Sequence, residues 1–242
     1  MTPIDENFIP GIHRYCDRWC ERCEFTARCS VFAAEQSYTD EELDPGSETF
    51  VRSLKNIFAE AKQMLIEKAE EMGIDPTPIS DEEYTEIRRR EHEFIDASDL
   101  GRMSREYGFN IRPILESKDE WFDTEAGEAG TFGDIFSVIY WYQFLIGAKA
   151  HFAMHGLLDL DGFEDDSLAN DPQSNANGSA KLAIIAVERS ILAWTYLLTL
   201  KNSEVIRPIL RQLETIKFLL EEKFPNARDF VRPGFDEIEL VM

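Results

Sequence analysis

Two long apolar segments limit how this 242-residue chain can fold. Residues 132–158 and 179–200 carry apolar side chains on nearly every helical face. A helix that is apolar all round must be surrounded, so we expect these segments at the centre of the protein. Hydrophobic residues make up 43% of the chain, which is enough for such a core and too much for a disordered protein.

Amphipathic helices are predicted on the outside of this pair. In residues 47–72 and 203–224 apolar side chains recur at three- and four-residue spacing. Ser47 is a good N-cap for the first of these helices, and Gly73 ends it. Strand signals are poor throughout, so the predicted fold class is all-α, a helical bundle or a layered helical fold.

The remaining segments are polar. Ser80-Asp-Glu-Glu83 is a capping box that opens a very polar helix to about Ala97. A further helix or two is expected in residues 99–117. Residues 118–131 and 159–177 are expected to be loops, the second of them unusually long for a compact domain.

Four cysteines, the only ones in the chain, lie within fourteen residues near the N-terminus: Cys16, Cys20, Cys23 and Cys29. Thiolates this close repel one another unless a cation or a covalent bond neutralises them. The first residues lack the basic and apolar regions of a signal peptide, so we expect a cytoplasmic protein. A reducing compartment disfavours disulfides, which makes the thiols candidate metal ligands. We therefore expect a cysteine-rich segment, residues 1–36, packed on an α-helical domain, residues 37–242, in one compact unit.

The spacing C-x3-C-x2-C-x5-C favours a [4Fe–4S] cluster. Residues 7–24 can form a helix that begins near Pro10; if residues 10–24 are one continuous helix, Cys16 and Cys23 lie about 10 Å apart along its axis. One tetrahedral zinc needs sulfurs only about 3.8 Å apart, and structural zinc sites more often use two separate C-x2-C pairs. A cluster spreads its thiolates wider and suits one compact run. Zinc remains the alternative, and without any metal the cysteines would be small buried hydrophobes.

Cationic and aromatic residues interleave with the cysteines. The arginines would offset the negative charge of a cluster, or they would pair with Asp17, Glu21 and Glu24 on a solvent-exposed helix face. The aromatic rings would shield a cluster from water. These residues are Arg14, Arg18, Arg22 and Arg28, with Tyr15, Trp19, Phe25 and Phe32.

Two resemblances arise at the same residues. Cys16-x3-Cys20-x2-Cys23 resembles the cluster triad of radical S-adenosylmethionine enzymes, a family with a β/α barrel. Cys20-Glu-Arg-Cys23-Glu-Phe-Thr-Ala-Arg-Cys29 is similar to the C-x2-C-x5-C clip of iron–sulfur nucleases of the RecB type. The chain has no alternating strand–helix pattern for the first family and no distant fourth cysteine for the second. The resemblances therefore support an iron–sulfur cluster, but they do not support the activity of either enzyme family.

A weaker second candidate for a metal site is the pair His151 and His155, which share one helix face. Glu188 or the loop Asp159–Asp166 would have to supply a third ligand. The alternative is that both histidines complement the C-terminal dipole of their helix. Glu188 can also pair with Lys149, or both can lie on a solvated stripe. Glu91-His92-Glu93 is more typical of a charged surface helix than of an acid–base site.

The net charge of −22 disfavours nucleic acid and anionic membranes as partners, and it is compatible with a basic protein partner. Four-thiolate coordination leaves no open metal position, so a non-catalytic role is expected. The predicted function is a redox or regulatory iron–sulfur protein. The alternative is an interaction module in which zinc or a cluster pins the N-terminal segment.

Overall fold

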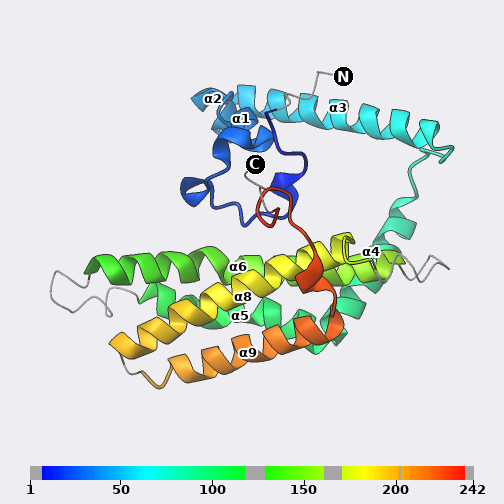
Figure 1. Ribbon diagram of the computed structural model, residues 1–242. Helices are drawn as coiled ribbons and strands as arrows, with labels where there is room; N and C mark the ends of the chain where they lie inside the picture. Colours follow the sequence, from blue (N-terminus) through cyan, green and yellow to red (C-terminus); the bar gives the residue numbers. More distant parts are fainter. Residues whose placement is uncertain (1–6, 118–128, 161–170, 202, 238–242) are drawn as a thin grey trace, which may run out of the picture. The chain divides into compact units, whose positions relative to one another are not determined.

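The computed structural model describes residues 7–117, 129–160, 171–201 and 203–237, without the side chains of 129–131 and 159–160. Within these ranges every regular element is helical and none is a strand (Figure 1), which confirms the all-α fold class. Packing divides the chain into a first unit, residues 1–9 and 23–88, and a second unit, residues 10–22 and 89–242. The expected boundary after residue 36 stays a prediction.

The second unit contains a bundle of four long helices: α5 (Asp99–Glu116), α6 (Ala129–Leu160), α8 (Asn175–Leu200) and α9 (Ile206–Lys223). α6 packs along α8, α5 packs against α6, and α9 contacts both α8 and α5 (Figure 1). We expected the 47–72 helix beside the central pair, but α5 is the fourth helix of this bundle. The periodicity of residues 47–72 shows an apolar face without showing what that face contacts.

The core of the second unit lies between α6 and α8, as the two apolar segments predict. Ile139, Ile146, Trp194 and Leu197 are almost fully buried. Trp194 Nε1 donates a 3.0 Å hydrogen bond to the Tyr107 hydroxyl, and burial raises the pKa of this tyrosine to about 12. Burying the two polar groups together satisfies both of them.

One side of α6 departs from the expectation that it is surrounded. Tyr140, Phe144 and Phe152 are 65%, 51% and 59% exposed. All three lie on one helical face, because they are separated by four and eight residues. The all-round apolar pattern therefore covers both a core face and an aromatic outer face.

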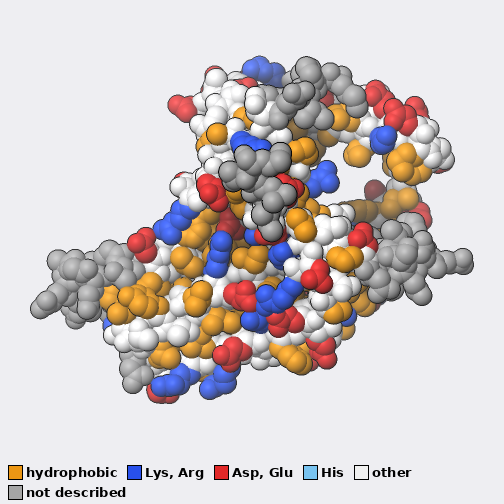
Figure 2. Space-filling model, viewed as in Figure 1, with side chains coloured by type: hydrophobic (Ala, Val, Ile, Leu, Met, Phe, Trp, Pro, Cys, Tyr) orange, Lys and Arg blue, Asp and Glu red, His pale blue; other side chains and the backbone are white. Residues whose placement is uncertain are grey.

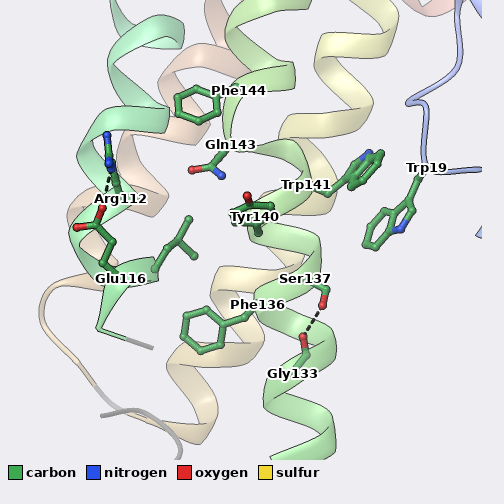
Figure 3. Close-up of a pocket in the computed structure, with 11 residues that line it drawn as sticks. Trp19, Arg112, Glu116, Gly133, Phe136, Ser137, Tyr140, Trp141, Gln143 and Phe144 are labelled. Atoms are coloured by element: carbon green, nitrogen blue, oxygen red, sulfur yellow. Dashed lines mark hydrogen bonds and ion pairs between the residues drawn. The ribbon is translucent and has the colours of Figure 1, made fainter. Parts of the chain in front are cut away.

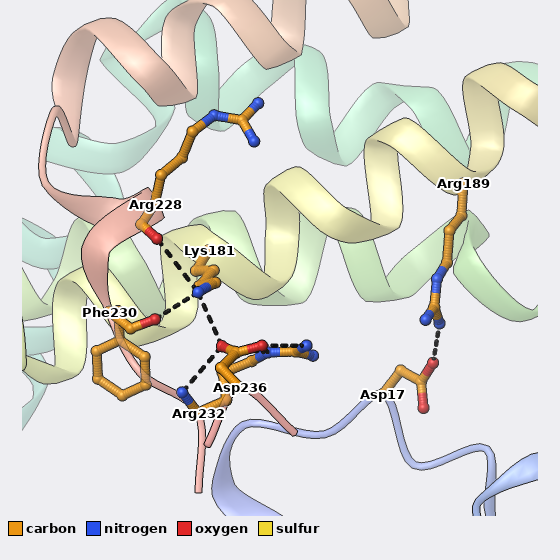
Figure 4. Close-up of polar contacts among 7 residues, drawn as sticks. All are labelled: Asp17, Lys181, Arg189, Arg228, Phe230, Arg232 and Asp236. Atoms are coloured by element: carbon orange, nitrogen blue, oxygen red, sulfur yellow. Dashed lines mark hydrogen bonds and ion pairs between the residues drawn. The ribbon is translucent and has the colours of Figure 1, made fainter. Parts of the chain in front are cut away.

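The chain that follows α9 packs back on α8 through polar contacts (Figure 4). Lys181 Nζ lies 2.8 Å from Asp236 Oδ2 and donates to the Phe230 carbonyl at 2.5 Å. Asp236 also pairs with Arg232 at 2.8 Å. Burial alone would raise the pKa of Asp236, but hydrogen bonds from Arg232 and Lys181 hold it well below its ordinary value. These contacts fasten the C-terminal turn to the bundle.

Charges of both signs alternate on the outside of the second unit (Figure 2). Glu188 of α8 pairs with Lys217 at 2.8 Å and with Arg228 at 2.7 Å, and Arg228 also pairs with Glu221. Burial opposes ionisation of Glu188, but its cationic partners still lower its pKa. Glu188 thus pairs with α9 and the following turn, whereas Lys149 reaches the Arg14 carbonyl at 3.4 Å. The proposed Glu188–Lys149 pair does not form.

The first unit contains α1 (Ser30–Glu35), α2 (Asp40–Leu43) and α3 (Glu48–Glu71). Ser47 Oγ accepts a hydrogen bond from Phe50 N at 2.9 Å, as expected of an N-cap. Gly73 has φ 70°, and the Ile74 amide donates back to the Ala69 carbonyl at 2.8 Å. This left-handed closure ends α3 where the sequence predicts. α3 buries no side chain, and Phe58, Met64 and Leu65 are exposed.

α4 (Asp81–Ala97) crosses the division between the two units after Arg88. Ser80 Oγ accepts from Glu83 N at 3.2 Å, so the predicted cap is present. The last turn of α4 contributes Ile95 to the core of the second unit.

The expected helix over residues 7–24 is wrong. Two 3₁₀ turns occupy this stretch, Ile12–Arg14 and Cys20–Arg22. Arg18 between them has φ 60°, a left-handed conformation that interrupts a right-handed helix. Long-range contacts of the neighbouring Asp17 stabilise this irregular path, which local periodicity cannot reveal.

Candidate functional site

The four cysteines lie on irregular backbone. Cys16 and Cys20 belong to the second unit, and Cys23 and Cys29 belong to the first. All four are partly buried and none forms a disulfide. Cys20 begins a 3₁₀ turn, and Cys29 precedes the first residue of α1. In the described part of the chain, no three potential ligands are gathered closely enough to hold a metal ion.

The broken helix changes the argument about which metal fits. The separation of about 10 Å between Cys16 and Cys23 assumed a continuous helix. Because residues 12–22 contain two short turns joined by a left-handed residue, that separation no longer applies. Spacing therefore does not exclude a single zinc ion.

Asp17 anchors the segment that carries Cys16 and Cys20, residues 10–22, which we call the docked segment. Its Oδ2 accepts a 2.6 Å hydrogen bond from the Tyr142 hydroxyl of α6 and another, also 2.6 Å, from Arg189 of α8. Its backbone carbonyl accepts from Trp141 Nε1 at 2.8 Å. Figure 4 shows Arg189 reaching from α8 to the Asp17 carboxylate. One residue thus binds the docked segment to both central helices.

The charge states of this cluster are mutually dependent. Burial is the main reason that the pKa of Tyr142 rises to about 12, and the hydrogen bond to Asp17 raises it further. Burial works against the charge of Arg189, but its contacts with Tyr142 and Asp17 leave its pKa raised. At neutral pH the Tyr142 phenol is therefore neutral and the Arg189 guanidinium is charged.

Stacked rings form a second anchor. The indoles of Trp19 and Trp141 lie with centroids 5.0 Å apart and planes inclined by 15°. The Arg22 guanidinium lies over the Trp19 ring, 4.2 Å from its centroid, and pairs with Asp134 at 3.0 Å. The residue that precedes Cys20 is consequently held by aromatic and cationic neighbours.

Tyr15 forms a third anchor beside Cys16. Its hydroxyl donates to Asn175 Oδ1 at 2.5 Å, and its ring packs 4.5 Å from that of Phe230. A Cβ added at Gly178 would collide with both rings. Glycine at this position of α8 therefore allows the tyrosine to approach the helix backbone closely.

One cationic group, Lys149, interacts with Cys16. The Lys149 ammonium interacts electrostatically with Cys16 and Arg18, while burial, the largest effect, lowers its pKa. The Cys16 thiol donates weakly to the His13 carbonyl at 3.5 Å. Burial, followed by Arg18 and Arg14, lowers the pKa of His13 and favours the neutral ring. His13 Nδ1 is buried with no hydrogen-bond partner in the described residues, so it is a nitrogen ligand candidate that sequence reasoning missed.

The second candidate site is only partly assembled. His155 Nε2 lies 3.2 Å from Glu91 Oε1, and the His151 ring lies 6.0 Å from that of His92. Glu188, the suggested third ligand, is engaged by Lys217 and Arg228 instead. The alternative ligands in Asp159–Asp166 fall outside the side chains that the structure describes. The side chain of Glu91 is 17% exposed, so this residue does not lie on a fully solvent-exposed helix face.

Sequence reasoning missed Asp17, Tyr142 and Arg189 as a unit. A signal was present, because Tyr142 and Arg189 lie inside segments that are otherwise apolar. A charged residue in such a segment needs a partner. Nothing in the local sequence indicates that the partner is Asp17, more than 120 residues earlier.

Comparison with known proteins finds no matching family model, no matching curated protein and no matching solved structure. Among the described helices, α8 alone is long and apolar enough to cross a membrane, and half of its most apolar window is buried in the bundle. A core helix has the same length and composition, so this signal is weak. The structure itself therefore defines the chain: a helical bundle with a cysteine-containing segment that polar contacts hold on α6 and α8.

Proposed function

We propose that Cys16, Cys20, Cys23 and Cys29 bind one metal centre, and that this centre is a [4Fe–4S] cluster. The observation that carries the proposal is the run of four thiols within fourteen residues, none of them in a disulfide. The chain has no other cysteine to complete a separate site. Such a protein would transfer electrons, sense redox state or use the cluster to stabilise its fold.

The irregular backbone around the cysteines supports this proposal. In residues 23–35, which follow the docked segment, no side chain is buried, although they contain a 3₁₀ turn and α1. Hydrophobic burial thus contributes little to their order. Metal–thiolate bonds are the usual means by which small segments without a core are held in one conformation.

The surroundings favour a cluster over zinc. Lys149 places positive charge near Cys16, which would offset the negative charge of a thiolate-bound cluster. Trp19, next to Cys20, is covered by Trp141 and Arg22 and would limit access of water. The single C-x2-C pair also differs from the paired motifs of structural zinc sites.

Zinc bound to the same thiols is the alternative, and it would make the protein a non-catalytic interaction module. In either case the coordination is saturated, so we do not assign a catalytic role. The net charge of −22 favours a basic protein as partner, and persistent thiols suit a reducing, cytoplasmic location.

Single cysteine variants test the ligand set. Cys16→Ser, Cys20→Ser, Cys23→Ser and Cys29→Ser should each lower the metal bound per chain, measured by elemental analysis after anaerobic purification. The control is the double variant His151→Ala and His155→Ala, which should keep its full metal content. Loss of metal in that control, with the cysteine variants unchanged, would move the site to the histidines.

A further inference from the structure

A hollow of about 850 Å³ lies on the second unit beside α5 and α6 (Figure 3). Its wall is mostly aromatic: Phe136, Tyr140 and Phe144 project from α6, and the Trp19–Trp141 stack borders the opposite side. A hollow of this size, lined by rings and a few polar groups, is typical of small-molecule sites. None of its lining residues belongs to the cysteine set.

Gln143 is the polar residue of the lining that can form hydrogen bonds with a ligand. Its side chain projects from α6 toward α5 in Figure 3, yet the residue is only 6% exposed. Because Gln143 lines the hollow, its carboxamide is a polar group with which a bound molecule can form hydrogen bonds.

The other polar groups near Gln143 already have partners. Arg112 Nε and Glu116 Oε1 pair with each other at 2.7 Å along α5. The Ser137 hydroxyl donates to the Gly133 carbonyl at 2.7 Å. Because the positive charge of Arg112 and the negative charge of Glu116 offset each other, the lining favours a neutral ligand.

Close helix packing fixes the position of Gln143. A Cβ added at Gly108 of α5 would lie 2.7 Å from the Gln143 carbonyl oxygen and 2.8 Å from the Phe144 ring. α5 therefore approaches α6 closely at this residue, and the backbone that carries the carboxamide has little freedom to shift.

We propose that this hollow binds a neutral, planar heteroaromatic molecule that has an amide or imide edge. The carboxamide presents a donor and an acceptor side by side, which matches the acceptor and donor of such an edge. The aromatic wall would pack on the faces of the ligand rings. The proposal does not depend on a metal at the cysteines.

Lumichrome is a suitable probe because it is neutral and planar and carries an imide edge. Its N,N′-dimethylated analogue keeps the rings but lacks the N–H donors. Isothermal titration of the full chain should show saturable binding of lumichrome, with the analogue bound at least about tenfold more weakly. Failure of lumichrome to bind, or equal affinity for both compounds, would overturn the proposal.

The variant Gln143→Leu keeps the volume and removes the amide. It should weaken lumichrome binding about tenfold and leave the affinity for the dimethylated analogue unchanged. The matched control is Gln63→Leu, since Gln63 is exposed on α3 and contacts Glu67; it should bind lumichrome normally. An unchanged lumichrome affinity in Gln143→Leu contradicts the proposal. If the circular dichroism spectrum of Gln143→Leu shows a loss of helix, the proposal is judged from the affinities of the unaltered chain for lumichrome and for the dimethylated analogue.

Discussion

Asp17 and Arg189 are joined by a 2.6 Å ion pair that connects the docked segment to α8. The two residues are far apart in sequence, and the same carboxylate oxygen also receives the Tyr142 hydroxyl of α6. The contact fixes the residue next to Cys16 against α6 and α8 of the second unit. Half of the cysteine set is therefore presented from a fixed position of the bundle.

Replacing Asp17 with alanine should destabilise the protein by about 1–3 kcal/mol, because the partly buried Tyr142 and Arg189 lose their shared acceptor. Urea unfolding followed by tryptophan fluorescence measures this change. The matched control is Asp134→Ala, which removes an ion pair with Arg22 whose members are 76% and 48% exposed. The control should cost less than about 0.5 kcal/mol. Equal effects of the two changes would show that Asp17 is not an anchor.

Two glycine-to-alanine changes should act in opposite directions. Gly178→Ala places a methyl group against the rings of Tyr15 and Phe230 and should lower stability by about 1–3 kcal/mol. At Gly133 of α6 an added Cβ has no neighbour within 4 Å among the described residues, so Gly133→Ala should raise stability by about 0.5–1 kcal/mol through better helix propensity. Thermal unfolding of both variants provides the measurement. A stabilised Gly178→Ala protein would mean that Tyr15 does not pack there.

The ion pairs of Asp236 should give a defined acid dependence. Its pKa is depressed in the folded protein by Arg232 and Lys181, so its contribution to stability is complete above the ordinary carboxyl pKa of about 3.9. That contribution decreases as the pH falls below this value and disappears below the folded-state pKa. Asp236→Asn should therefore be less stable than the unaltered chain at neutral pH by about 1–3 kcal/mol.

The same comparison made across pH supplies the check. Denaturation at a series of pH values should show the two stability curves converging in acid, because the variant has no carboxylate to protonate at this position. Curves that stay parallel down to the acid limit would contradict the assigned role of Asp236.

Local signals in the sequence were sufficient for most helices. Ser47, Gly73 and Ser80 set the ends of α3 and α4 through caps and a left-handed closure, which depend on a few adjacent residues. The two apolar segments likewise identify α6 and α8 as the centre of the bundle. In α6 and α8 local preference and tertiary packing agree.

Contacts distant in sequence could not be predicted in this way. The docked segment has a helix-like pattern, but Asp17 binds Tyr142 and Arg189 and the left-handed Arg18 breaks the helix. Gln143 of α6 shows the same limit. The sequence does not reveal that α5 packs closely against this residue, so it does not indicate that the polar side chain lines a hollow. Four clustered cysteines predict a metal, whereas their spacing alone does not choose between iron–sulfur and zinc.

The central claim is that one cluster gathers the four cysteines, and metal and sulfide analysis of anaerobically purified protein tests it most directly. The account predicts a brown, reducible sample that contains about four iron atoms and four acid-labile sulfides per chain. A colourless sample with one zinc would replace the cluster with a structural ion. A sample without stoichiometric metal, in which all four thiols react freely with a thiol reagent, would contradict the account.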